Sequence, residues 1–366
     1  MTDTRTLSVA LDVGSLIGPP TGIGRFTADL SRHLRDRPDV AVIPYVLSYR
    51  ADLPPGTRRL KYPARLALAA WAKTDWPTAR RTLQGADLVH GTNYVVPPTG
   101  LPTLVSVHDL TLFQRPELVL PVVRTFGDVI RRAVDRGAFV HTISYAVAND
   151  VRTLLHTDRV RVVYPGPTYD PDQVVGPLPS QLRKRKYILS IGTREPRKNL
   201  PRLIEAFGLM HRSNEDCLLV LAGAPGADDE SIRRATRSVA PYTARSIVTL
   251  GYVDDATRAA LFTNATVFAY PSLDEGFGLP LLEAMHYGVP IVGSTAGAIP
   301  EVAADAALLV DPTNVEALAM ALQDAYDNHV RRPRLIAAGR QRRGLFSWAR
   351  ATDEMVALYR EVVEHG

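Results

Sequence analysis

The stretch AYPSLDEGFGLPLLEAMHYG, residues 269–288, decides the fold of the half of the chain in which it lies. An apolar run over 265–270 is typical of a buried strand, and Pro271-Ser272 ends it. Pro280 suits the first position of a helix, because its missing N–H would be unpaired there anyway. Apolar residues at helical spacing follow that proline. The stretch therefore predicts a strand, a tight turn and a helix.

The turn in this stretch, Gly276-Phe277-Gly278, has the features of an anion site. Its glycines let the backbone approach a ligand with no Cβ in the way. Free N–H groups at the start of the helix, with the helix dipole behind them, favour a phosphate. Glu275 and Glu283 flank the turn, and carboxylates accept hydrogen bonds from paired sugar hydroxyls. The plainer interpretation is a strand–loop–helix connection with two solvated glutamates.

The wider string that starts at Glu275, EGFGLPLLEA, resembles the E-x7-E motif of family 4 glycosyltransferases. Members of that family are retaining enzymes of the GT-B fold. The resemblance therefore implies an α/β chain with two Rossmann-like, doubly wound parallel-sheet domains that face a central cleft. It also implies that Glu283 binds the ribose hydroxyls and Glu275 the sugar. The amides from Gly276 to Leu279 would then bind the diphosphate.

The length of 366 residues suits two domains, and 46% hydrophobic with 22% charged residues is an ordinary globular composition. The single cysteine, Cys217, lies in an apolar run and is expected to be buried, so no disulfide can form within the chain. Zinc fingers and iron–sulfur clusters are excluded because their cysteine ligands are lacking. The net charge of +5 suits an anionic small substrate or a membrane surface and does not require nucleic acid.

The N-terminal sequence MTDTRTLSVALDV lacks the layout of a signal peptide, and no apolar run reaches the ~18 residues of a membrane span. We therefore expect a cytoplasmic protein, with a peripheral contact at the inner membrane face left open. Residues 48–82 bear on that contact, because they carry eight cations against two acids and include Trp71 and Trp76. We favour a solvated helix pair with a loop over a basic amphipathic surface that contacts lipid or an anionic acceptor. The cations are Arg50, Arg58, Arg59, Lys61, Arg65, Lys73, Arg80 and Arg81.

A Gly-rich loop, residues 14–24, follows the first predicted strand and precedes a helical pattern. It contains Gly22-x-Gly24 with no third glycine and no clear ribose acid, so the dinucleotide fingerprint is weak. The family resemblance implies another role, in a turn that faces the donor phosphates and the acceptor. Gly22 and Gly24 match it as donor-binding residues and Arg25 as an acceptor-binding residue, although Thr21 stands where a glycine pair is common.

Polar residues also follow two later strands predicted in the first half. Asn93 comes after one of them, and His108-Asp109 follows the strand over 104–107. The carboxyl ends of buried parallel strands are where α/β clefts place working groups, while a capping Asp and a partly buried His is the plainer interpretation. The string SVHDL, 106–110, matches the HD segment of the family. This implies that His108 is catalytic and contacts the donor sugar or the acceptor hydroxyl, with Asn93 and Asp109 on the acceptor side.

Residues 167–186 contain four prolines and end in four consecutive cations, a composition typical of a domain boundary. We predict an acceptor-binding domain from 1–166, a linker over 167–186 and a nucleotide-sugar-binding domain from 187–346. Periodicity shows only that 347–366 is helical. The resemblance, through a Phe-Ser-Trp segment, implies that this last helix returns to the first domain.

The second half opens with a strand that is followed by GTREPRKN, which starts at Gly192. Cations after a strand, at the mouth of a helix, suit a diphosphate, while generic loop cations are the plainer interpretation. The string closely resembles the family's diphosphate-binding segment. It implies that Gly192, Arg194 and Lys198 bind the phosphates and that Arg197 points elsewhere. By the same resemblance, Val253 contacts the nucleobase through its backbone.

The function expected from these residues is transfer of a sugar, with retention, from a nucleotide-diphosphate sugar. GDP-mannose is slightly favoured over UDP and dTDP sugars, because GTREPRKN looks most like mannosyltransferases. Glu275, Arg194, Lys198 and His108 are the expected catalytic residues. No Asp-x-Asp metal motif accompanies the phosphate segments, so cations and a helix N-terminus would replace Mg²⁺, and no further cofactor is expected.

The acceptor stays open among a lipid-linked glycan, a polysaccharide and a small natural product. Other GT-B enzymes, such as a nucleotide-sugar epimerase or a phosphorylase, and a non-catalytic nucleotide-sugar-binding protein are the alternatives. A Rossmann dehydrogenase is disfavoured because the third glycine and the ribose acid are missing.

Overall fold

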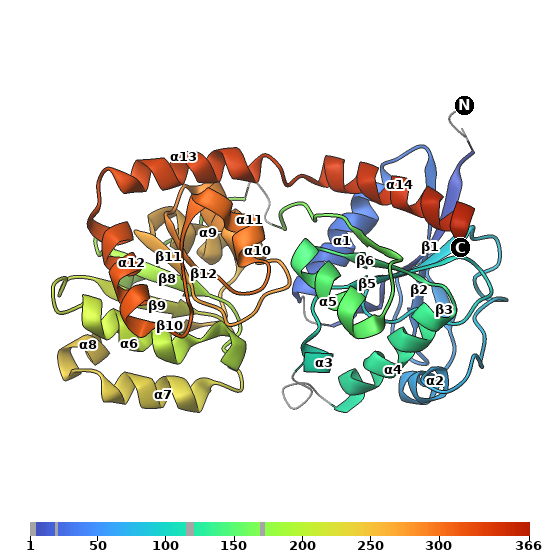
Figure 1. Ribbon diagram of the computed structural model, residues 1–366, viewed down its shortest axis with the longest axis horizontal. Helices are drawn as coiled ribbons and strands as arrows, with labels where there is room; N and C mark the ends of the chain where they lie inside the picture. Colours follow the sequence, from blue (N-terminus) through green and yellow to red (C-terminus); the bar gives the residue numbers. More distant parts are fainter. Residues whose placement is uncertain (1–4, 19–20, 115–120, 169–172) are drawn as a thin grey trace. The chain divides into compact units, whose positions relative to one another are not determined.

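The computed structural model describes residues 5–18, 21–114, 121–168 and 173–366. By its internal contacts the chain forms two compact units. Unit 1 comprises Met1–Thr168 and Phe346–Gly366, and unit 2 comprises Tyr169–Leu345. In each unit helices cover both faces of one parallel sheet (Figure 1). The predicted doubly wound α/β architecture is confirmed.

The described part of unit 1 contains a seven-stranded sheet with the order β3-β2-β1-β4-β5-β6-β7. β1 pairs with β2 and with β4, and the strand order reverses between these two neighbours. Such a reversal is where parallel sheets bind ligands, outside the carboxyl ends of the strands. The strands are β1 Leu7–Asp12, β2 Val40–Leu47, β3 Arg58–Leu60, β4 Leu88–Gly91, β5 Thr103–Val107, β6 Phe139–Thr142 and β7 Val160–Val162.

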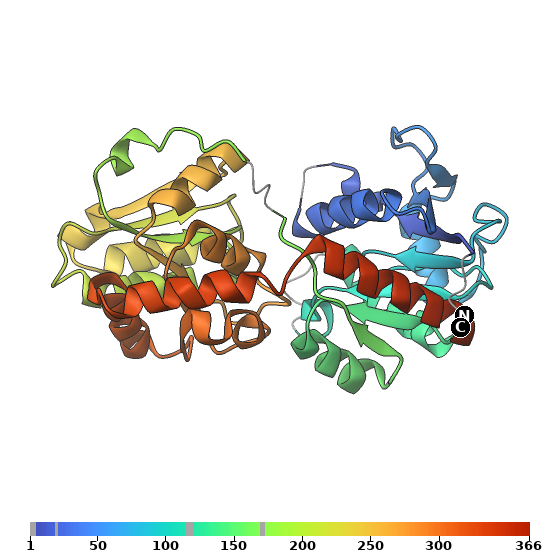
Figure 2. The ribbon, with the colours of Figure 1, turned by 90° about the horizontal axis from the view of Figure 1, so that it is seen from above.

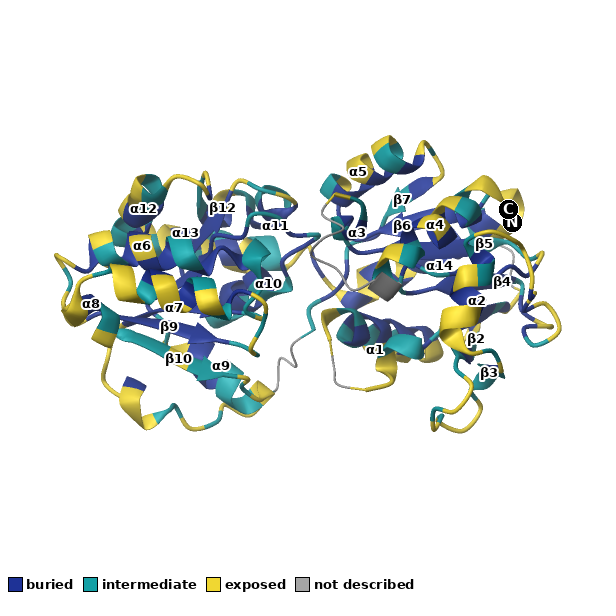
Figure 3. Cartoon of the chain, turned by 90° about the horizontal axis from the view of Figure 1, so that it is seen from below, coloured by how far each residue is buried: buried dark blue, intermediate teal, exposed yellow. Residues whose placement is uncertain are grey.

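The helices of unit 1 divide between the two faces of its sheet. α2, α4 and α5 bury their apolar sides in one core, while α1 and α14 pack together on the opposite face. Figure 3 shows the result, with buried strands between helices whose outer sides are exposed. The helices are α1 Gly22–Arg35, α2 Ala64–Trp71, α3 Thr111–Gln114, α4 Pro121–Asp135, α5 Tyr145–Leu155 and α14 Trp348–His365.

The described part of unit 2 contains a six-stranded sheet with the order β10-β9-β8-β11-β12-β13, which reverses between β9 and β11 on either side of β8. α6 and α12 pack together over a core on one face of this sheet. The strands are β8 Tyr187–Ile191, β9 Leu218–Ala222, β10 Ile247–Gly251, β11 Val267–Tyr270, β12 Ile291–Ser294 and β13 Ala307–Val310. The helices are α6 Leu200–Met210, α7 Asp229–Ser238, α8 Pro241–Arg245, α9 Asp255–Asn264, α10 Leu279–Tyr287, α11 Ile299–Ala303, α12 Val315–Asp327 and α13 Arg331–Arg343.

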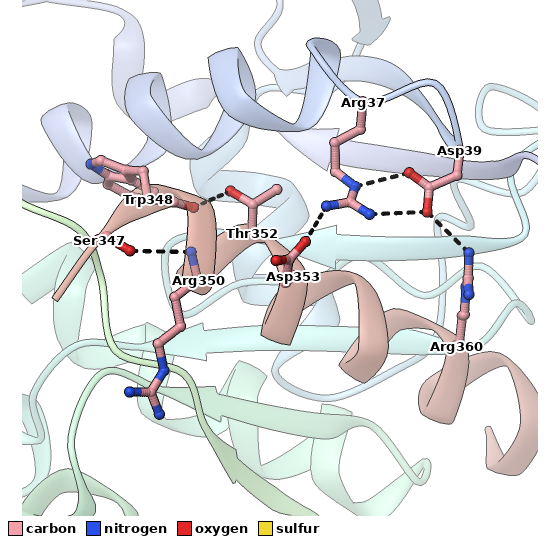
Figure 4. A network of polar contacts seen from close by, with 8 residues as sticks. All are labelled: Arg37, Asp39, Ser347, Trp348, Arg350, Thr352, Asp353 and Arg360. Carbon is pink, nitrogen blue, oxygen red and sulfur yellow. Dashed lines mark hydrogen bonds and ion pairs between the residues drawn. The ribbon is translucent and has the colours of Figure 1, made fainter. Parts of the chain in front are cut away.

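The C-terminal helix α14 belongs to unit 1, where it lies beside α1 (Figure 2). At its rim Asp353 pairs with Arg37, which also binds Asp39 at 2.8 Å, and Arg360 donates to Asp39 at 3.0 Å (Figure 4). Partly exposed ion pairs of this kind contribute little stability. Burial of the inner face of α14, including Tyr359 at 0% exposure, contributes more.

Candidate functional site

The predicted donor residues of unit 2 lie where strands of its parallel sheet end. Because the carboxyl ends of parallel strands meet at one edge, these residues share that edge of the sheet. Gly192, Arg194 and Lys198 follow β8, Val253 follows β10, Glu275 to Gly278 lie between β11 and α10, and Leu279 and Glu283 belong to α10.

Glu275 lies at the centre of an ion cluster and is 8% exposed. Lys198 Nζ donates to its Oε1 at 2.5 Å, and Arg197 Nη1 donates to its Oε2 at 2.6 Å. Lys198 Nζ also lies 3.0 Å from the Tyr270 hydroxyl, and Arg197 Nε binds Glu195 at 2.9 Å. Burial opposes ionisation of Glu275, but the charges of Lys198 and Arg197 outweigh it and hold its pKa at about 2. Glu275 is therefore a carboxylate throughout the neutral range.

The prediction that Arg197 points elsewhere is wrong. Arg197 and Lys198 lie in one tight turn, Pro196–Lys198, and both side chains reach Glu275. The backbone explains this, because Leu273 N donates to the Arg197 carbonyl at 2.7 Å and holds the glutamate loop against the turn.

Arg194 is paired within unit 2. Its Nε donates to Asp229 Oδ1 at 2.7 Å and its Nη2 to Asp229 Oδ2 at 3.3 Å. It still lines a small pocket together with Gly192, Lys198 and Ser272. A phosphate contact from Arg194 stays a prediction, and it requires the guanidinium to share its hydrogen bonds with Asp229.

The start of α10 is suited to an anion. Gly278 precedes the helix with φ 95° and ψ 52°, the left-handed region that favours glycine. A Cβ at Gly278 would also lie 2.9 Å from Leu281 Cδ1. The N-cap residue is this glycine, which has no side chain to cap the helix. Its backbone N–H groups and helix dipole therefore favour a phosphate, as the sequence predicts.

Glu283 has a partner that the sequence reasoning did not assign. Arg258 of α9 donates through Nε to Glu283 Oε2 at 2.5 Å and through Nη2 to Oε1 at 2.7 Å. This two-pronged pair fixes the carboxylate, which is 5% exposed. No local sequence pattern predicts this contact, because Arg258 and Glu283 are 25 positions apart. Ribose binding by Glu283 stays a prediction.

In unit 1, Gly22, Gly24 and Arg25 form the first turn of α1. Thr21, which stands where the family commonly has glycine, caps this helix by accepting a hydrogen bond from Gly24 N at 3.1 Å. A Cβ at Gly24 would lie 2.8 Å from the Ser15 carbonyl, so the close approach of the loop requires glycine. Gly22 and Gly24 thus lie in unit 1, whereas the other predicted donor residues lie in unit 2.

The structure brings Asn93, His108 and Asp109 to the carboxyl ends of the neighbouring strands β4 and β5. His108 Nε2 lies 2.8 Å from the Thr92 carbonyl, so that nitrogen carries the proton. Burial lowers the His108 pKa, and the ring is therefore neutral with Nδ1 as an acceptor. Asp109 accepts from Thr111 N at 3.0 Å, which is the capping role of the plainer interpretation.

Asp12 is a candidate that the sequence reasoning missed. It ends β1, accepts a hydrogen bond from Gly14 N at 2.8 Å, and binds the Thr92 hydroxyl through its carbonyl at 2.8 Å. Burial raises its pKa to about 6. The sequence does indicate this residue. Asp12 is a polar residue at the carboxyl end of an apolar strand, the same position that singled out His108.

Comparison with known proteins places the chain in a family. Residues 20–168 match the model of Glycosyltransferase Family 4, and residues 179–342 match that of glycosyl transferases group 1. The O-antigen chain mannosyltransferase B of Escherichia coli is 31% identical over 320 residues, 82% of this chain and 78% of that protein. The chain belongs to glycosyltransferase family 4. It is therefore a glycosyltransferase, similar to the mannosyltransferases of that family.

Other relatives agree with this family 4 assignment. The MMP alpha-(1->4)-mannosyltransferase of Mycolicibacterium hassiacum is 30% identical, covering 78% of this chain and 74% of that protein. The structure of sucrose-phosphate synthase from Thermosynechococcus elongatus has a TM-score of 0.75 at 19% identity over 98% of this chain and 100% of that one. Anabaena HepE, in complex with UDP and glucose, has a TM-score of 0.72 at 17% identity over 97% and 100%. These structures show that the family 4 chain has the GT-B fold, as predicted.

Proposed function

We propose that the chain transfers mannose from GDP-mannose to an acceptor hydroxyl with retention of configuration. The observation that carries the proposal is the cluster of Glu275, Arg197 and Lys198 beside the glycine N-cap of α10. The relatives named as mannosyltransferases support the sugar. The UDP bound to Anabaena HepE keeps a UDP sugar as the main alternative donor.

The ion cluster suggests how the donor binds. Arg197 and Lys198 exchange part of their hydrogen bonds with Glu275 for bonds to the incoming diphosphate. Glu275 then has oxygens available for the sugar hydroxyls, so that phosphate and sugar binding are linked through one carboxylate. The amides at the start of α10 complete the phosphate site.

The transfer itself follows from this arrangement. The bond between the anomeric carbon and the leaving phosphate oxygen breaks, and the acceptor oxygen bonds to the same face of that carbon. The acceptor proton passes to the leaving phosphate. Charge that develops on the diphosphate is stabilised by Arg197, Lys198 and the start of α10, which would make a metal ion unnecessary.

His108 contributes as a hydrogen-bond acceptor in unit 1. Its Nε2 proton is committed to the Thr92 carbonyl, so only Nδ1 is available to a ligand. A neutral Nδ1 accepts a hydrogen bond from a hydroxyl and thereby orients it. We assign this role to His108 toward the acceptor, with Asn93 and Asp109 beside it.

A basic face of unit 1 supports a peripheral contact with an anionic bilayer. Trp76 is 74% exposed and Leu66 is 69% exposed, and several cations of the segment over 48–82 are exposed as well. Two other cations of this segment make hydrogen bonds within unit 1, since Arg58 donates to the Thr82 carbonyl and Arg59 to the Ala51 carbonyl. Among the described residues, no helix is both long and apolar enough to cross a membrane. The exposed cations of this segment are Arg50, Lys61, Arg65, Lys73, Arg80 and Arg81.

The stereochemistry of donor hydrolysis tests the proposed function. We expect GDP-mannose labelled with ¹³C at the anomeric carbon to be hydrolysed slowly when no acceptor is supplied. NMR should show the α-anomer of mannose before mutarotation. The β-anomer as first product would overturn retention, and hydrolysis of UDP sugars alone would overturn the donor.

A further inference from the structure

Asn199 occupies an unusual place in unit 2. It follows the turn that carries Arg197 and Lys198 and precedes α6. Its backbone has φ 57° and ψ 33°, the left-handed region, which asparagine tolerates better than most other residues with a Cβ. The side chain is 2% exposed. A buried polar side chain in this conformation calls for a reason.

Helix capping is not that reason. Asparagine at the start of a helix ordinarily accepts a hydrogen bond from an early backbone N–H. Among the described residues, the Asn199 side chain makes no such bond to α6. Its Oδ1 accepts instead from Arg202 Nη1 at 2.9 Å.

The amide nitrogen of Asn199 joins three segments of the chain. Nδ2 donates to the Pro271 carbonyl at 3.1 Å and to the Pro312 carbonyl at 2.7 Å. Pro271 directly follows β11, and Pro312 lies just beyond β13. Both Nδ2 protons are therefore used, and each binds a carbonyl at the edge of the sheet where the candidate donor site lies.

These bonds bear directly on the ion cluster. Pro271 begins the loop that carries Glu275, and Asn199 adjoins the turn that carries Lys198. The loop and the turn are joined a second time by the bond from Leu273 N to the Arg197 carbonyl at 2.7 Å. The 2.5 Å contact between Lys198 and Glu275 thus depends on two backbone segments that Asn199 fastens together.

We propose that Asn199 is a positioning residue that holds Lys198 in place for the diphosphate of the donor. The proposal rests on the proposed function. Asn199 acts through the lysine, so its loss should weaken binding of a nucleoside diphosphate more than it weakens the fold.

Two substitutions separate the side chain from the backbone. Asn199→Gly keeps the left-handed conformation without strain and removes three side-chain hydrogen bonds, two donated by Nδ2 and one accepted by Oδ1. Asn199→Ser leaves one hydroxyl donor for the two carbonyls. We use GDP as the probe in isothermal titration calorimetry. We expect GDP affinity to fall about tenfold in Asn199→Gly, because Lys198 loses its charge-assisted contact with the diphosphate, and to fall less in Asn199→Ser.

Asn264→Ala is the control for loss of an asparagine side chain elsewhere in unit 2. Asn264 Nδ2 also donates to a backbone carbonyl of unit 2, that of Ala260 at 2.9 Å, at the end of α9. Its substitution removes this hydrogen bond and should leave GDP affinity unchanged. Equal losses of GDP affinity in Asn264→Ala and Asn199→Gly would overturn the proposal.

A double-mutant cycle of GDP affinities with Lys198→Ala tests whether the effect of Asn199 depends on Lys198. If it does, Asn199→Gly should change GDP affinity by less than about twofold once Lys198 is gone, because neighbouring residues in one network are not additive. A full additional tenfold loss would show that Asn199 acts independently of Lys198 and would overturn the proposal.

The outcomes distinguish this inference from the proposed function. Wild-type protein that binds GDP, together with an Asn199→Gly variant of equal affinity, overturns only the role of Asn199. Wild-type protein that binds no nucleoside diphosphate overturns both. If Asn199→Gly does not fold, as judged by circular dichroism, Asn199→Ser decides by the same criteria.

Discussion

Glu275 is the residue on which the ion cluster depends. Glu275→Gln removes the negative charge between Arg197 and Lys198 and leaves two cations close together with one carboxylate fewer. Because the same carboxylate is assigned to the sugar hydroxyls, we expect hydrolysis of GDP-mannose to fall by about 10²–10³ in kcat, the usual cost of losing one preorganised electrostatic contact. Glu195→Gln is the control, because Glu195 binds Arg197 but is not assigned to the ligand. Turnover of Glu275→Gln near that of the wild type would contradict the assignment.

The tautomers of two buried histidines in unit 1, His90 and His141, follow from one hydrogen bond to the Val163 carbonyl. His141 Nε2 must donate to the Val163 carbonyl at 3.1 Å, so His141 Nδ1 accepts from the Ser106 hydroxyl at 2.8 Å. Ser106 then accepts from His90 Nε2 at 2.7 Å, and His90 Nδ1 accepts from the Tyr359 hydroxyl at 2.7 Å. The hydrogen bonds that link His141, Ser106, His90 and Tyr359 are all made only while both imidazole rings are neutral.

These hydrogen bonds predict that acid destabilises unit 1. Burial lowers the pKa of His90 well below 6.5 and that of His141 to about 3. Both pKa values are lower folded than unfolded, so the stabilisation is complete above pH 6.5 and is lost as pH falls from there toward 3. We expect the free energy of unfolding, measured with urea, to fall steadily from pH 7.5 to 5.

His141→Gln should make that pH dependence shallower, because one of the buried histidines that take up a proton on unfolding is gone. Tyr359→Phe is the control, since it removes a hydrogen bond to His90 but leaves both histidines. It should lower stability by about 1–3 kcal/mol without flattening the pH dependence. An unchanged pH slope in His141→Gln would contradict this account.

At the scale of elements, α14 is fastened where the chain leaves and re-enters unit 1. Trp348 Nε1 donates to the Pro167 carbonyl at 2.8 Å, and a Cβ at Gly166 would lie 2.4 Å from Trp348. Gly166→Ala should therefore lower the free energy of unfolding by about 1–3 kcal/mol, the cost of overpacking.

Gly22→Ala tests whether that loss is specific. A Cβ at Gly22 would meet no atom of the described residues within 4 Å, so thermal unfolding should change little. If both substitutions lower the melting temperature equally, the contact between Gly166 and Trp348 does not hold α14.

The strands of both sheets were largely predictable from the sequence, because fully buried parallel strands read as continuous apolar runs. The strand predicted over 104–107, for example, is β5, Thr103–Val107. The helix pair expected over 48–82 is wrong, because among the described residues this segment forms one strand and one helix. It contains β3, which has only three residues, and the short α2, and such elements are too brief to show a period.

The candidate site was predictable where a local motif carries it and not where distant residues meet. The turn before α10 and its glycines could be inferred from neighbouring residues alone. The pairing of Arg197 with Glu275 spans 78 positions and that of Arg258 with Glu283 spans 25, so no local pattern predicts either. Asn199 shows the same limit, since its partner Pro312 lies 113 positions away.

At the scale of the whole molecule, the basic face of unit 1 predicts binding to anionic lipid. The protein should float with vesicles that contain phosphatidylglycerol at low salt and should detach as salt screens the cations. Trp76→Ser, which removes an exposed apolar side chain, should weaken this binding, while Tyr252→Ser in unit 2, also an exposed aromatic, should not. Absence of flotation at low salt would contradict the membrane contact.

The central claim is that unit 2 binds the nucleoside diphosphate of a sugar donor through Lys198 and its neighbours. Isothermal titration calorimetry of the full chain with GDP, UDP, ADP, dTDP and NAD tests it most directly. We predict binding of GDP ahead of the other diphosphates, no binding of NAD, and a loss of about tenfold or more in Lys198→Ala, as expected for a charge-assisted phosphate contact. Binding of NAD alone, or of no nucleotide at all, would contradict the claim.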